Sequence, residues 1–323
     1  MKTLRILYLG GGWITNIGNA FIDLGSIHSL RMACPDIQIY FVSDMPRVIF
    51  SIFRSNLSNV LDLAGVIKCD YLVLSGAILS AKFIQLNGSV ISKLIKKGVK
   101  LIINGGGGST YTEEEIDTVT RFLRKNPPYI FISRDRQTFE NYSYLSEYSY
   151  DGIDCGFFVS DFFVPAELDL PEFIVLNFDP IGGPFNYLAS LIKHLFDKNK
   201  KLFRTSTIDG KLIIRTHHSF IPFMPHRYFR ETNVLISDNP YDYLNLYAHT
   251  KATYSNRVHA CVATLAFNNP ARLFSNTPRA ALLDRVGANT IREKLTYPDI
   301  QKIRDEKLNQ VKFLSKILVE ETS

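Results

Sequence analysis

The chain's most constraining feature is the stretch at residues 252–275, which reads ATYSNRVHACVATLAFNNPARLFS. Its first three residues are β-prone, and residues 257–267 carry apolar side chains at helical spacing. Ser255 and Asn256 are favourable N-cap residues for this helix, which the Asn-Asn-Pro sequence after it ends. An apolar run at residues 271–274 then predicts a second buried strand. Because strand–helix–strand units of this kind build parallel sheets, the segment indicates an α/β fold.

The same alternation of strands and helices continues through the rest of the chain. Buried strands are predicted at residues 4–9, 71–74, 99–103, 129–133, 173–178, 212–215 and 234–237. Helices are predicted at residues 16–32, 113–125, 185–196 and 240–249, and an amphipathic helix at residues 300–318. Turns at residues 75–76 and 104–109 are expected to end two of the strands, and the tyrosines of the helix at 240–249 are expected to be exposed.

A proline-containing stretch at residues 157–172 divides this pattern into two halves. A chain of 323 residues is long enough for about two domains, each with its own core. We therefore expect an N-terminal α/β domain at residues 1–165 and a second α/β domain at residues 166–290. Residues 291–323 contain the amphipathic helix, which we expect to pack back on the first domain.

Composition and charge narrow the classes of partner. Hydrophobic residues make up 46% of the chain and charged residues 21%, as in an ordinary globular protein. The formal net charge is +6, but no DNA-binding or RNA-binding motif accompanies it, so nucleic acid is not an expected partner. The positive net charge is also compatible with weak attraction to an anionic membrane surface. The sequence shows neither a signal peptide nor an apolar run that could span a membrane, and we therefore expect a cytoplasmic protein.

Arg257 and His259 are the polar residues of the opening segment, and both fall in the first turn of its helix. Ligands of open α/β sheets bind beyond the carboxyl ends of the strands, where this turn should lie. A helix N-terminus adds free backbone N–H groups and the positive end of the helix dipole, which favour anions. The two residues therefore predict an anion site. The alternative interpretation is a solvated arginine and a histidine that serves only packing.

A first glycine-rich stretch, at residues 10–12, follows a predicted strand and leads to Asn16, Gly18 and Asn19 at the start of a helix. Strand, glycine-rich turn and helix together resemble a phosphate-binding loop. The spacing matches neither G-x-G-x-x-G nor the Walker A motif, so it gives little support for nucleotide binding. Equally, the glycines can simply permit a tight turn between strand and helix.

A second glycine-rich stretch, at residues 104–109, follows the strand predicted at 99–103. Consecutive glycines let a ligand or another backbone approach closely, so we expect ligand contacts here. The expected contacts are Gly105, Gly106 and Gly107. Arg134 and Asp135 follow the next predicted strand, where either an internal ion pair or a ligand contact would explain them.

Two further features concern metals and disulfides. The chain contains four cysteines, Cys34, Cys69, Cys155 and Cys261. None belongs to a C-x-x-C pair, which argues against a disulfide framework and against a zinc site. His217 and His218 are adjacent, but no carboxylate or cysteine lies at ligand spacing from them, so no metal site is predicted. A hydroxyl-binding or acid–base role is expected instead, because their strand should end beside Arg257.

The R-V-H-A sequence at residues 257–260, followed by an apolar helix, Pro270 and an apolar strand, resembles the R-x-H-A signature of the polysaccharide pyruvyl transferase family. The two glycine-rich stretches and the Arg-Asp pair at 134–135 are similar to that family as well. One position departs from it, since Asn19 stands where aspartate is common. The resemblance implies two Rossmann-like lobes facing a cleft, similar to B-type glycosyltransferases, with the donor on the second lobe.

The resemblance also implies an activity and a set of residues. Members of the family move a pyruvyl group from phosphoenolpyruvate onto a sugar of a polysaccharide or glycan precursor, as a ketal. The arginine and histidine of the signature are associated with donor binding and catalysis, and these roles carry over to Arg257 and His259. The other residues expected to bind donor or substrate are Asn16, Gly18, Asn19, Gly105, Gly106, Gly107, Arg134, His217, His218, Asn256 and Arg279.

The chemistry of such a reaction fits these residue types. Phosphoenolpyruvate carries a carboxylate and a phosphate, which guanidinium groups bind in bidentate fashion, so Arg257 is the expected clamp. Protonation of the methylene carbon calls for an acid that titrates near neutrality, for which His259 is the candidate. No metal or redox cofactor is demanded. Two alternatives share the scaffold, namely a glycosyltransferase with a nucleotide-sugar donor and a catalytically inactive binding relative.

Overall fold

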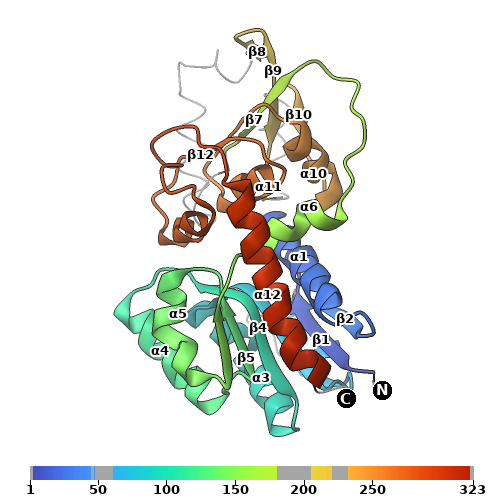
Figure 1. Cartoon of the computed structure of the whole chain (residues 1–323), viewed down its shortest axis with the longest axis vertical. Helices are drawn as coiled ribbons and strands as arrows, with labels where there is room; N and C mark the ends of the chain where they lie inside the picture. Colours follow the sequence, from blue (N-terminus) through green and yellow to red (C-terminus); the bar gives the residue numbers. More distant parts are fainter. Residues whose placement is uncertain (1–2, 45–46, 48–60, 180–204, 220–231, 321–323) are drawn as a thin grey trace.

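A computed structural model describes residues 3–44, 47, 61–179, 205–219 and 232–320. These residues form two lobes, each built on one sheet, and a long C-terminal helix runs from the second lobe back along the first (Figure 1). The predicted α/β class and the two-lobe architecture are confirmed. The helix predicted at residues 185–196 lies outside the described residues.

The first lobe contains a parallel sheet with the strand order β2-β1-β3-β4-β5-β6. The strands are β1 Arg5–Gly10, β2 Gln38–Ser43, β3 Tyr71–Leu79, β4 Lys100–Gly108, β5 Ile130–Ser133 and β6 Tyr148–Asp151. The helices are α1 Gly18–Ala33, α3 Ala81–Lys96, α4 Glu113–Lys125 and α5 Arg136–Tyr142, with short 3-10 turns η2 Leu63–Gly65 and η3 Ser143–Leu145. Helices α3 and α4 cover one face and α1 the other, which is why the central strands read as continuous apolar runs.

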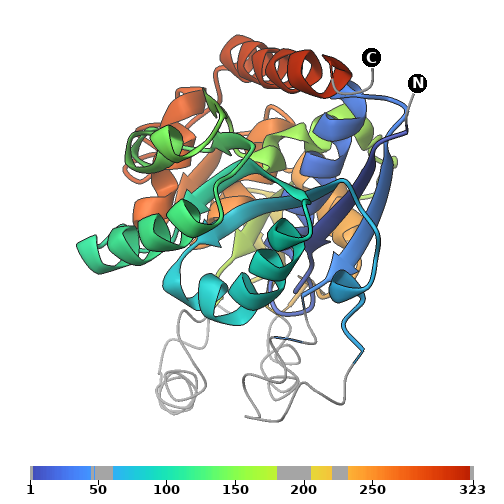
Figure 2. The ribbon, with the colours of Figure 1, turned by 90° about the horizontal axis from the view of Figure 1, so that it is seen from below.

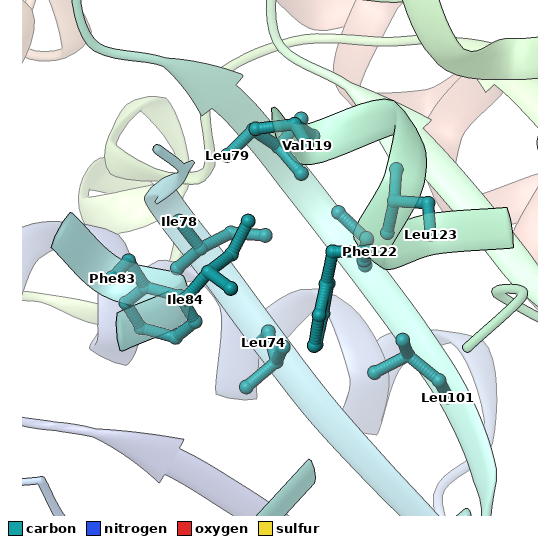
Figure 3. Close-up of a pocket in the computed structure, with 10 residues that line it drawn as sticks. Leu74, Ile78, Leu79, Phe83, Ile84, Leu101, Val119, Phe122 and Leu123 are labelled. Atoms are coloured by element: carbon teal, nitrogen blue, oxygen red, sulfur yellow. The ribbon is translucent and has the colours of Figure 1, made fainter. Parts of the chain in front are cut away.

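The face under α3 and α4 encloses a small apolar pocket (Figure 3). Its lining comes from the two strands β3 and β4 and from the two helices, and consists of Leu74, Ile78, Leu79, Phe83, Ile84, Leu101, Ile103, Val119, Phe122 and Leu123. Every lining side chain is aliphatic or aromatic, so the pocket offers no polar group that could orient a substrate. It is part of the hydrophobic core.

The second lobe contains a sheet with the order β10-β9-β7-β11-β12, whose strands are parallel, while β8 pairs with β9 in antiparallel fashion. The strands are β7 Phe173–Asn177, β8 Thr207–Ile208, β9 Lys211–Thr216, β10 Val234–Leu235, β11 Thr253–Ser255 and β12 Ala271–Leu273. The helices are α10 Pro240–His249, α11 Val258–Ala266 and the 3-10 helix η5 Pro278–Val286. The predicted unit at residues 252–275 is therefore confirmed as β11, α11 and β12, with β11 parallel to β12.

Two short turns connect the lobes, η4 Cys155–Phe158 and α6 Val159–Phe162, and the last helix, α12 Ile300–Glu320, returns along the first lobe. Figure 2 shows α12, in red, next to α1, with which it is in contact. Its apolar side chains Leu314 and Ile317 pack in the same core cluster as Ile6 of β1. Lys307 of α12 forms an ion pair with Asp161 of α6, which ties the helix to the connection between the lobes.

Three details of the predicted elements are wrong. The turns predicted at residues 75–76 and 104–109 lie largely inside β3 and β4, which continue to Leu79 and Gly108 with shifts in register. The tyrosines of α10 are mostly buried rather than exposed, since Tyr243 and Tyr247 are 1% and 0% exposed and only Tyr241 reaches the surface. The N-cap of α11 is Arg257, one residue beyond the predicted caps.

All four cysteines are unpaired thiols. Within the part of the chain that the structure describes, no helix is both long and apolar enough to cross a bilayer.

Candidate functional site

Polar residues gather where the carboxyl ends of the two sheets meet. Five of them follow a strand by no more than three residues, namely Arg134 after β5, Asp154 after β6, Asp179 after β7, His217 after β9 and Arg257 after β11. Hydrogen bonds cross between the lobes at this point. His259 Nε2 lies 3.3 Å from Asp154 Oδ2, and Ile17 N donates to His218 O at 2.7 Å. The strand ends of both lobes therefore contribute to one site, as open α/β sheets predict.

Arg257 begins α11 with an extended backbone, at φ −105° and ψ 122°. Ser255 Oγ accepts a hydrogen bond from Arg257 N at 2.8 Å, which fixes the turn between β11 and the helix. The side chain donates from Nε to Asp179 Oδ2 at 3.0 Å and from Nη2 to Ser219 Oγ at 2.6 Å. About a fifth of the side chain, 22%, stays exposed, so it is accessible to an anionic ligand.

His259 lies in the first turn of α11 and reaches towards the first lobe. Its partner Asp154 is fully buried, and the same carboxylate oxygen is 3.2 Å from Arg134 Nη1, while Gly156 N donates to the other oxygen at 2.8 Å. Burial alone would raise the pKa of Asp154, but the positive charges of His259 and Arg134 and the hydrogen bonds outweigh it and lower the pKa to about 2. Asp154 is therefore an anion that orients the His259 ring.

Asp179 organises the second lobe's part of the site. Its carboxylate lies 3.1 Å from His217 Nδ1, accepts from His218 N at 2.9 Å, and pairs with Arg257. Burial opposes ionisation, but the hydrogen bond from His217 and the charge of Arg257 lower the pKa of Asp179 to about 2. Asn256 holds the backbone of Asp179 on both sides, with Oδ1 accepting from its N at 3.0 Å and Nδ2 donating to its O at 2.6 Å. The described contacts of Asn256 are thus those of a residue that positions Asp179.

His218 is buried between α1 and α10. Its Nε2 lies 2.6 Å from the Tyr247 hydroxyl, and its Nδ1 has no hydrogen-bond partner within the described part of the chain. Burial first, and the neighbouring positive charges of Arg257 and His259 after it, lower the pKa of His218 to about 3. The ring is therefore neutral at physiological pH, and the two adjacent histidines differ, because His217 is the one that an ionised carboxylate holds.

The N-terminus of α1 lies against both histidine-bearing segments. A Cβ added to Gly18 would lie 2.9 Å from His259 Cβ and 3.3 Å from His218 Nδ1, so only glycine lets the lobes approach this closely. Asn16 Nδ2 donates to Asn19 Oδ1 at 3.1 Å, and Asn16 Oδ1 accepts from Gly18 N at 3.2 Å. The structure thus brings the predicted residues Asn16, Gly18 and Asn19 together beside His259.

The predicted contacts Gly105, Gly106 and Gly107 lie in β4 and are buried. Gly105 has a left-handed backbone, φ 66°, and a Cβ there would lie 2.8 Å from Cys155 Sγ. A Cβ on Gly107 would lie 2.2 Å from Arg134 Nε. The close approach that these glycines permit is therefore made by the chain's own residues, above all by the Arg134 side chain.

A cluster of positive charge results. Arg134, fully buried, donates from Nη2 to Gly108 O at 3.3 Å and pairs with Asp154, while Arg279 donates from Nε to Thr277 Oγ1 at 3.3 Å. Burial, followed by repulsion from Arg134 and Arg257, lowers the pKa of Arg279. Three guanidinium groups thus lie near one another, and among the described residues Arg279 has no ion-pair partner. An anion bound here would relieve this repulsion.

The prediction from sequence missed the two carboxylates on which this arrangement depends. Asp154 and Asp179 carry no motif. Asp179 follows the apolar strand β7, which is the signal that could have found it, whereas β6 before Asp154 reads YSYD and gives no such signal. Among the described residues, no group of three or more histidine, cysteine, aspartate and glutamate side chains could hold a metal ion.

The chain is similar to one known protein family. The family model described as polysaccharide pyruvyl transferase matches residues 16–278, which include the α1 start, both carboxylates, Arg257 and His259. A search of curated protein sequences found no match to the chain.

Among solved structures, the chain is similar to the Staphylococcus aureus MnaA–UDP complex, with a TM-score of 0.55 and 12% identity over 97% of this chain and 91% of that chain. It is also similar to the Methanocaldococcus jannaschii UDP-GlcNAc 2-epimerase in complex with UDP-GlcNAc and UDP, with a TM-score of 0.54 and 10% identity over 99% of each chain. At these identities the likeness concerns the fold alone. It agrees with the predicted similarity to B-type glycosyltransferases.

Proposed function

Because this chain belongs to the polysaccharide pyruvyl transferase family and is therefore a transferase, we propose that it moves the pyruvyl group of phosphoenolpyruvate onto a sugar of a polysaccharide or glycan precursor. The product is a cyclic ketal in which one carbon of the former pyruvyl group bridges two hydroxyl oxygens of the sugar. A cell-surface glycan is the acceptor class that such a reaction suits.

The observation that carries the proposal is the cationic cluster at the junction of the lobes. The Arg257 side chain is 22% exposed, Arg279 has no ion-pair partner among the described residues, and Arg279 is repelled by both Arg134 and Arg257. The two ionised carboxylates of the site are already engaged by His259, His217 and the arginines. A small donor with a carboxylate and a phosphate supplies the negative charge that this cluster lacks.

In this proposal, Arg257 and Arg279 bind different anionic groups of the donor. Arg257 begins α11, so an anion that it clamps also meets the N–H groups and the positive dipole end of that nine-residue helix. Arg279 begins η5 after β12, and it approaches the same site from the neighbouring strand. The two guanidinium groups suit the two anionic ends of phosphoenolpyruvate.

His259 is the proton donor in this proposal. It protonates the methylene carbon, which becomes the methyl group, and the carbon bearing the phosphate becomes electrophilic. One sugar hydroxyl adds to that carbon and gives up its proton, the C–O bond to phosphate breaks, and the neighbouring hydroxyl closes the ketal. One of the two hydroxyl protons restores His259 and the other leaves with phosphate, so the reaction is balanced. Asp154 keeps the ring oriented through these steps.

The test is phosphate release from phosphoenolpyruvate in the presence of galactose-, mannose- and glucosamine-type acceptors. We expect release with one acceptor class and none without acceptor. A parallel assay with nucleotide sugars tests the alternative, a glycosyltransferase. Release of nucleotide without any use of phosphoenolpyruvate would refute the proposed donor, and binding of neither donor would favour a catalytically inactive relative.

Two further points belong to the proposal. The reaction uses no metal or redox cofactor, because proton transfer and charge neutralisation are supplied by side chains. A cytoplasmic enzyme would have direct access to phosphoenolpyruvate, and cell fractionation tests that location.

A further inference from the structure

The loop between β1 and α1 carries two aromatic side chains that the donor chemistry does not use. The rings of Trp13 and Phe41 lie with centroids 5.4 Å apart and planes inclined by 47°, and we call this pair the aromatic corner. Trp13 Nε1 donates to Asp23 Oδ2 at 2.7 Å, and the buried Asp23 also accepts from Gly11 N at 2.8 Å. Phe41 lies on the edge strand β2 and is 39% exposed. The corner is therefore a fixed aromatic surface that is open to solvent.

Polar groups gather beside the aromatic corner, around Gly12. That residue has a left-handed backbone, φ 67°, and a Cβ added to it would lie 3.5 Å from Asn19 Nδ2, 3.5 Å from Thr15 Oγ1 and 3.8 Å from Asp44 Oδ1. Asp44 Oδ1 is buried and accepts no hydrogen bond from the residues that the structure describes. Such a carboxylate oxygen is costly to leave unsatisfied, so a hydroxyl donor at this point would stabilise it.

The first turn of α1 links these groups to the proton donor of the proposed reaction. Asn19 Oδ1 accepts a hydrogen bond from Asn16 Nδ2 at 3.1 Å. A Cβ placed on Gly18 would lie 3.2 Å from Asn16 Oδ1 and 2.9 Å from His259 Cβ. These contacts therefore lead from Asp44 through Asn19 and Asn16, at the start of α1, to His259. A molecule bound against the aromatic corner reaches the reacting carbon from the first lobe, opposite the arginines of the second.

We propose that the aromatic corner, Asp44 and Asn19 bind a pyranose ring of the acceptor glycan. A pyranose has an apolar C–H face, which is attracted to the negative face of an aromatic ring, and hydroxyl groups at its edge. Asp44 accepts hydrogen bonds from such hydroxyls, and Asn19 both donates and accepts them. This combination of aromatic surface and few convergent polar groups is typical of small-molecule sites. The inference rests on the proposed function, since it names the acceptor side of the same site.

Trp13 provides a direct readout, because it is the single tryptophan of the chain. The experiment titrates the whole protein with methyl β-galactoside, methyl α-mannoside or N-acetylglucosamine, without phosphoenolpyruvate, and records tryptophan emission. We expect a saturable change with the sugar class that also supports phosphate release. Absence of any change with all three sugars, up to their solubility, overturns the proposal.

Two variants that retain Trp13 identify the site. Asp44→Asn removes the acceptor charge, and Phe41→Ala removes half of the aromatic corner; each is expected to raise the Kd of the sugar, and the KM of the acceptor, by about tenfold or more. The KM of phosphoenolpyruvate should stay within about twofold, because the donor arginines are untouched. Tyr40→Ala is the matched control, since Tyr40 is 38% exposed on the same strand but its side chain points to the opposite face, and it should change neither constant.

The outcomes separate this inference from the proposed function. If the sugar quenches Trp13 emission but phosphoenolpyruvate is never consumed, the proposed donor is wrong and the sugar site remains. If phosphate release proceeds with an acceptor whose KM is unchanged in Asp44→Asn and Phe41→Ala, the sugar site is wrong and the donor assignment remains. A rise in the KM of phosphoenolpyruvate alone would likewise overturn the acceptor site.

Discussion

Asp154→Asn is the substitution that tests the site's electrostatics most directly. The wild-type carboxylate is completely buried and pairs with His259 and with Arg134, whose side chain is also 0% exposed. The depression of the Asp154 pKa from 3.8 to about 2 corresponds to about 2 kcal/mol in favour of the ionised form. Asparagine removes that charge and leaves the Arg134 guanidinium buried without its partner. Breaking a buried pair in this way costs about 3–5 kcal/mol of stability.

The pH dependence of this loss has a definite sign. Because the pKa of Asp154 is lower in the folded protein than its ordinary value of 3.8, its contribution to stability is fully present above pH 3.8 and is lost as the pH falls towards 2. Wild-type stability should therefore decrease through this window. Asp154→Asn should start lower and lose about 2 kcal/mol less over the same window, since the titrating group is gone.

Urea unfolding at neutral pH, and at a series of pH values between about 5 and 2, measures both effects. The matched control is Asp117→Asn, because Asp117 forms an exposed ion pair with Arg121 at 3.0 Å, with 67% of each side chain accessible. An exposed pair of this kind contributes at most about 0.5 kcal/mol. If Asp154→Asn costs no more than Asp117→Asn, the buried carboxylate does not hold the site together as argued.

The same variant tests Asp154 as a positioning residue for His259. Without the carboxylate the His259 ring loses the partner that orients it, so the kcat of phosphate release should fall about tenfold or more. The KM of phosphoenolpyruvate should stay within about twofold, because Arg257 and Arg279 are unchanged. A purely structural role would lower kcat only in proportion to the fraction of folded protein, so an unchanged kcat per folded molecule would refute the positioning role even if the variant is destabilised.

Four other substitutions or treatments follow from the same geometry. Arg279→Met should raise the KM of phosphoenolpyruvate by about tenfold or more with little loss of stability, because Arg279 lacks an ion-pair partner among the described residues; urea unfolding and donor titration check both halves. Arg257→Ala should abolish the thermal stabilisation by phosphoenolpyruvate, whereas His259→Ala should keep that stabilisation and lose about 10²–10⁴-fold in turnover; full activity of His259→Ala would contradict its role as acid. Gly18→Ala should cost about 1–3 kcal/mol and lower activity, since the new Cβ would meet His259 Cβ at 2.9 Å. Incubation with EDTA should leave phosphate release unchanged, and a loss restored by a divalent cation would show that the reaction needs a metal.

The sequence predicted the elements of the fold well where local signals agreed with tertiary packing. Helix α4 begins after Thr112, whose Oγ1 accepts from Glu115 N, and α10 begins after Asn239, whose Oδ1 accepts from Tyr241 N. Threonine and asparagine are common N-cap residues, so the sequence alone indicates both helix starts, and both helices have the predicted bounds. The β11–α11–β12 unit was predicted equally well, because an apolar run at helical spacing lies between two β-prone runs and ends at an Asn-Asn-Pro sequence.

Local signals failed at the glycine run of β4. Four consecutive glycines are typical of a turn, yet Gly106 continues the ladder between β3 and β5, pairing with Gly76 and Ser133. The reason is tertiary, because the Arg134 side chain and the residues around Cys155 occupy the space that larger side chains would need. No short stretch of the sequence shows that these residues, which are distant in the chain, lie against the glycines.

The carboxylates of the site were missed for a related reason. Asp154 and His259 are 105 residues apart in the chain, and Asp179 and Arg257 are 78 apart, so no spacing rule joins them. Their association depends on the strand order within each sheet and on the contact between lobes. A strand-end carboxylate becomes informative only when the strand that neighbours it is known.

The contacts of the lobes give the R-x-H spacing of this chain a physical meaning. Arg257 is the N-cap of α11 with an extended backbone, whereas His259 lies in the first helical turn. The two side chains therefore reach different partners, Asp179 of the second lobe and Asp154 of the first. Both carboxylates remain ionised down to about pH 2, and each holds its partner side chain in place. In the proposed reaction, the donor clamp is thereby anchored to one lobe and the proton donor to the other. On that proposal, a donor molecule held by Arg257 would meet the acid only while the two lobes are in contact, and Gly18, which permits this contact, would affect catalysis without touching the substrate.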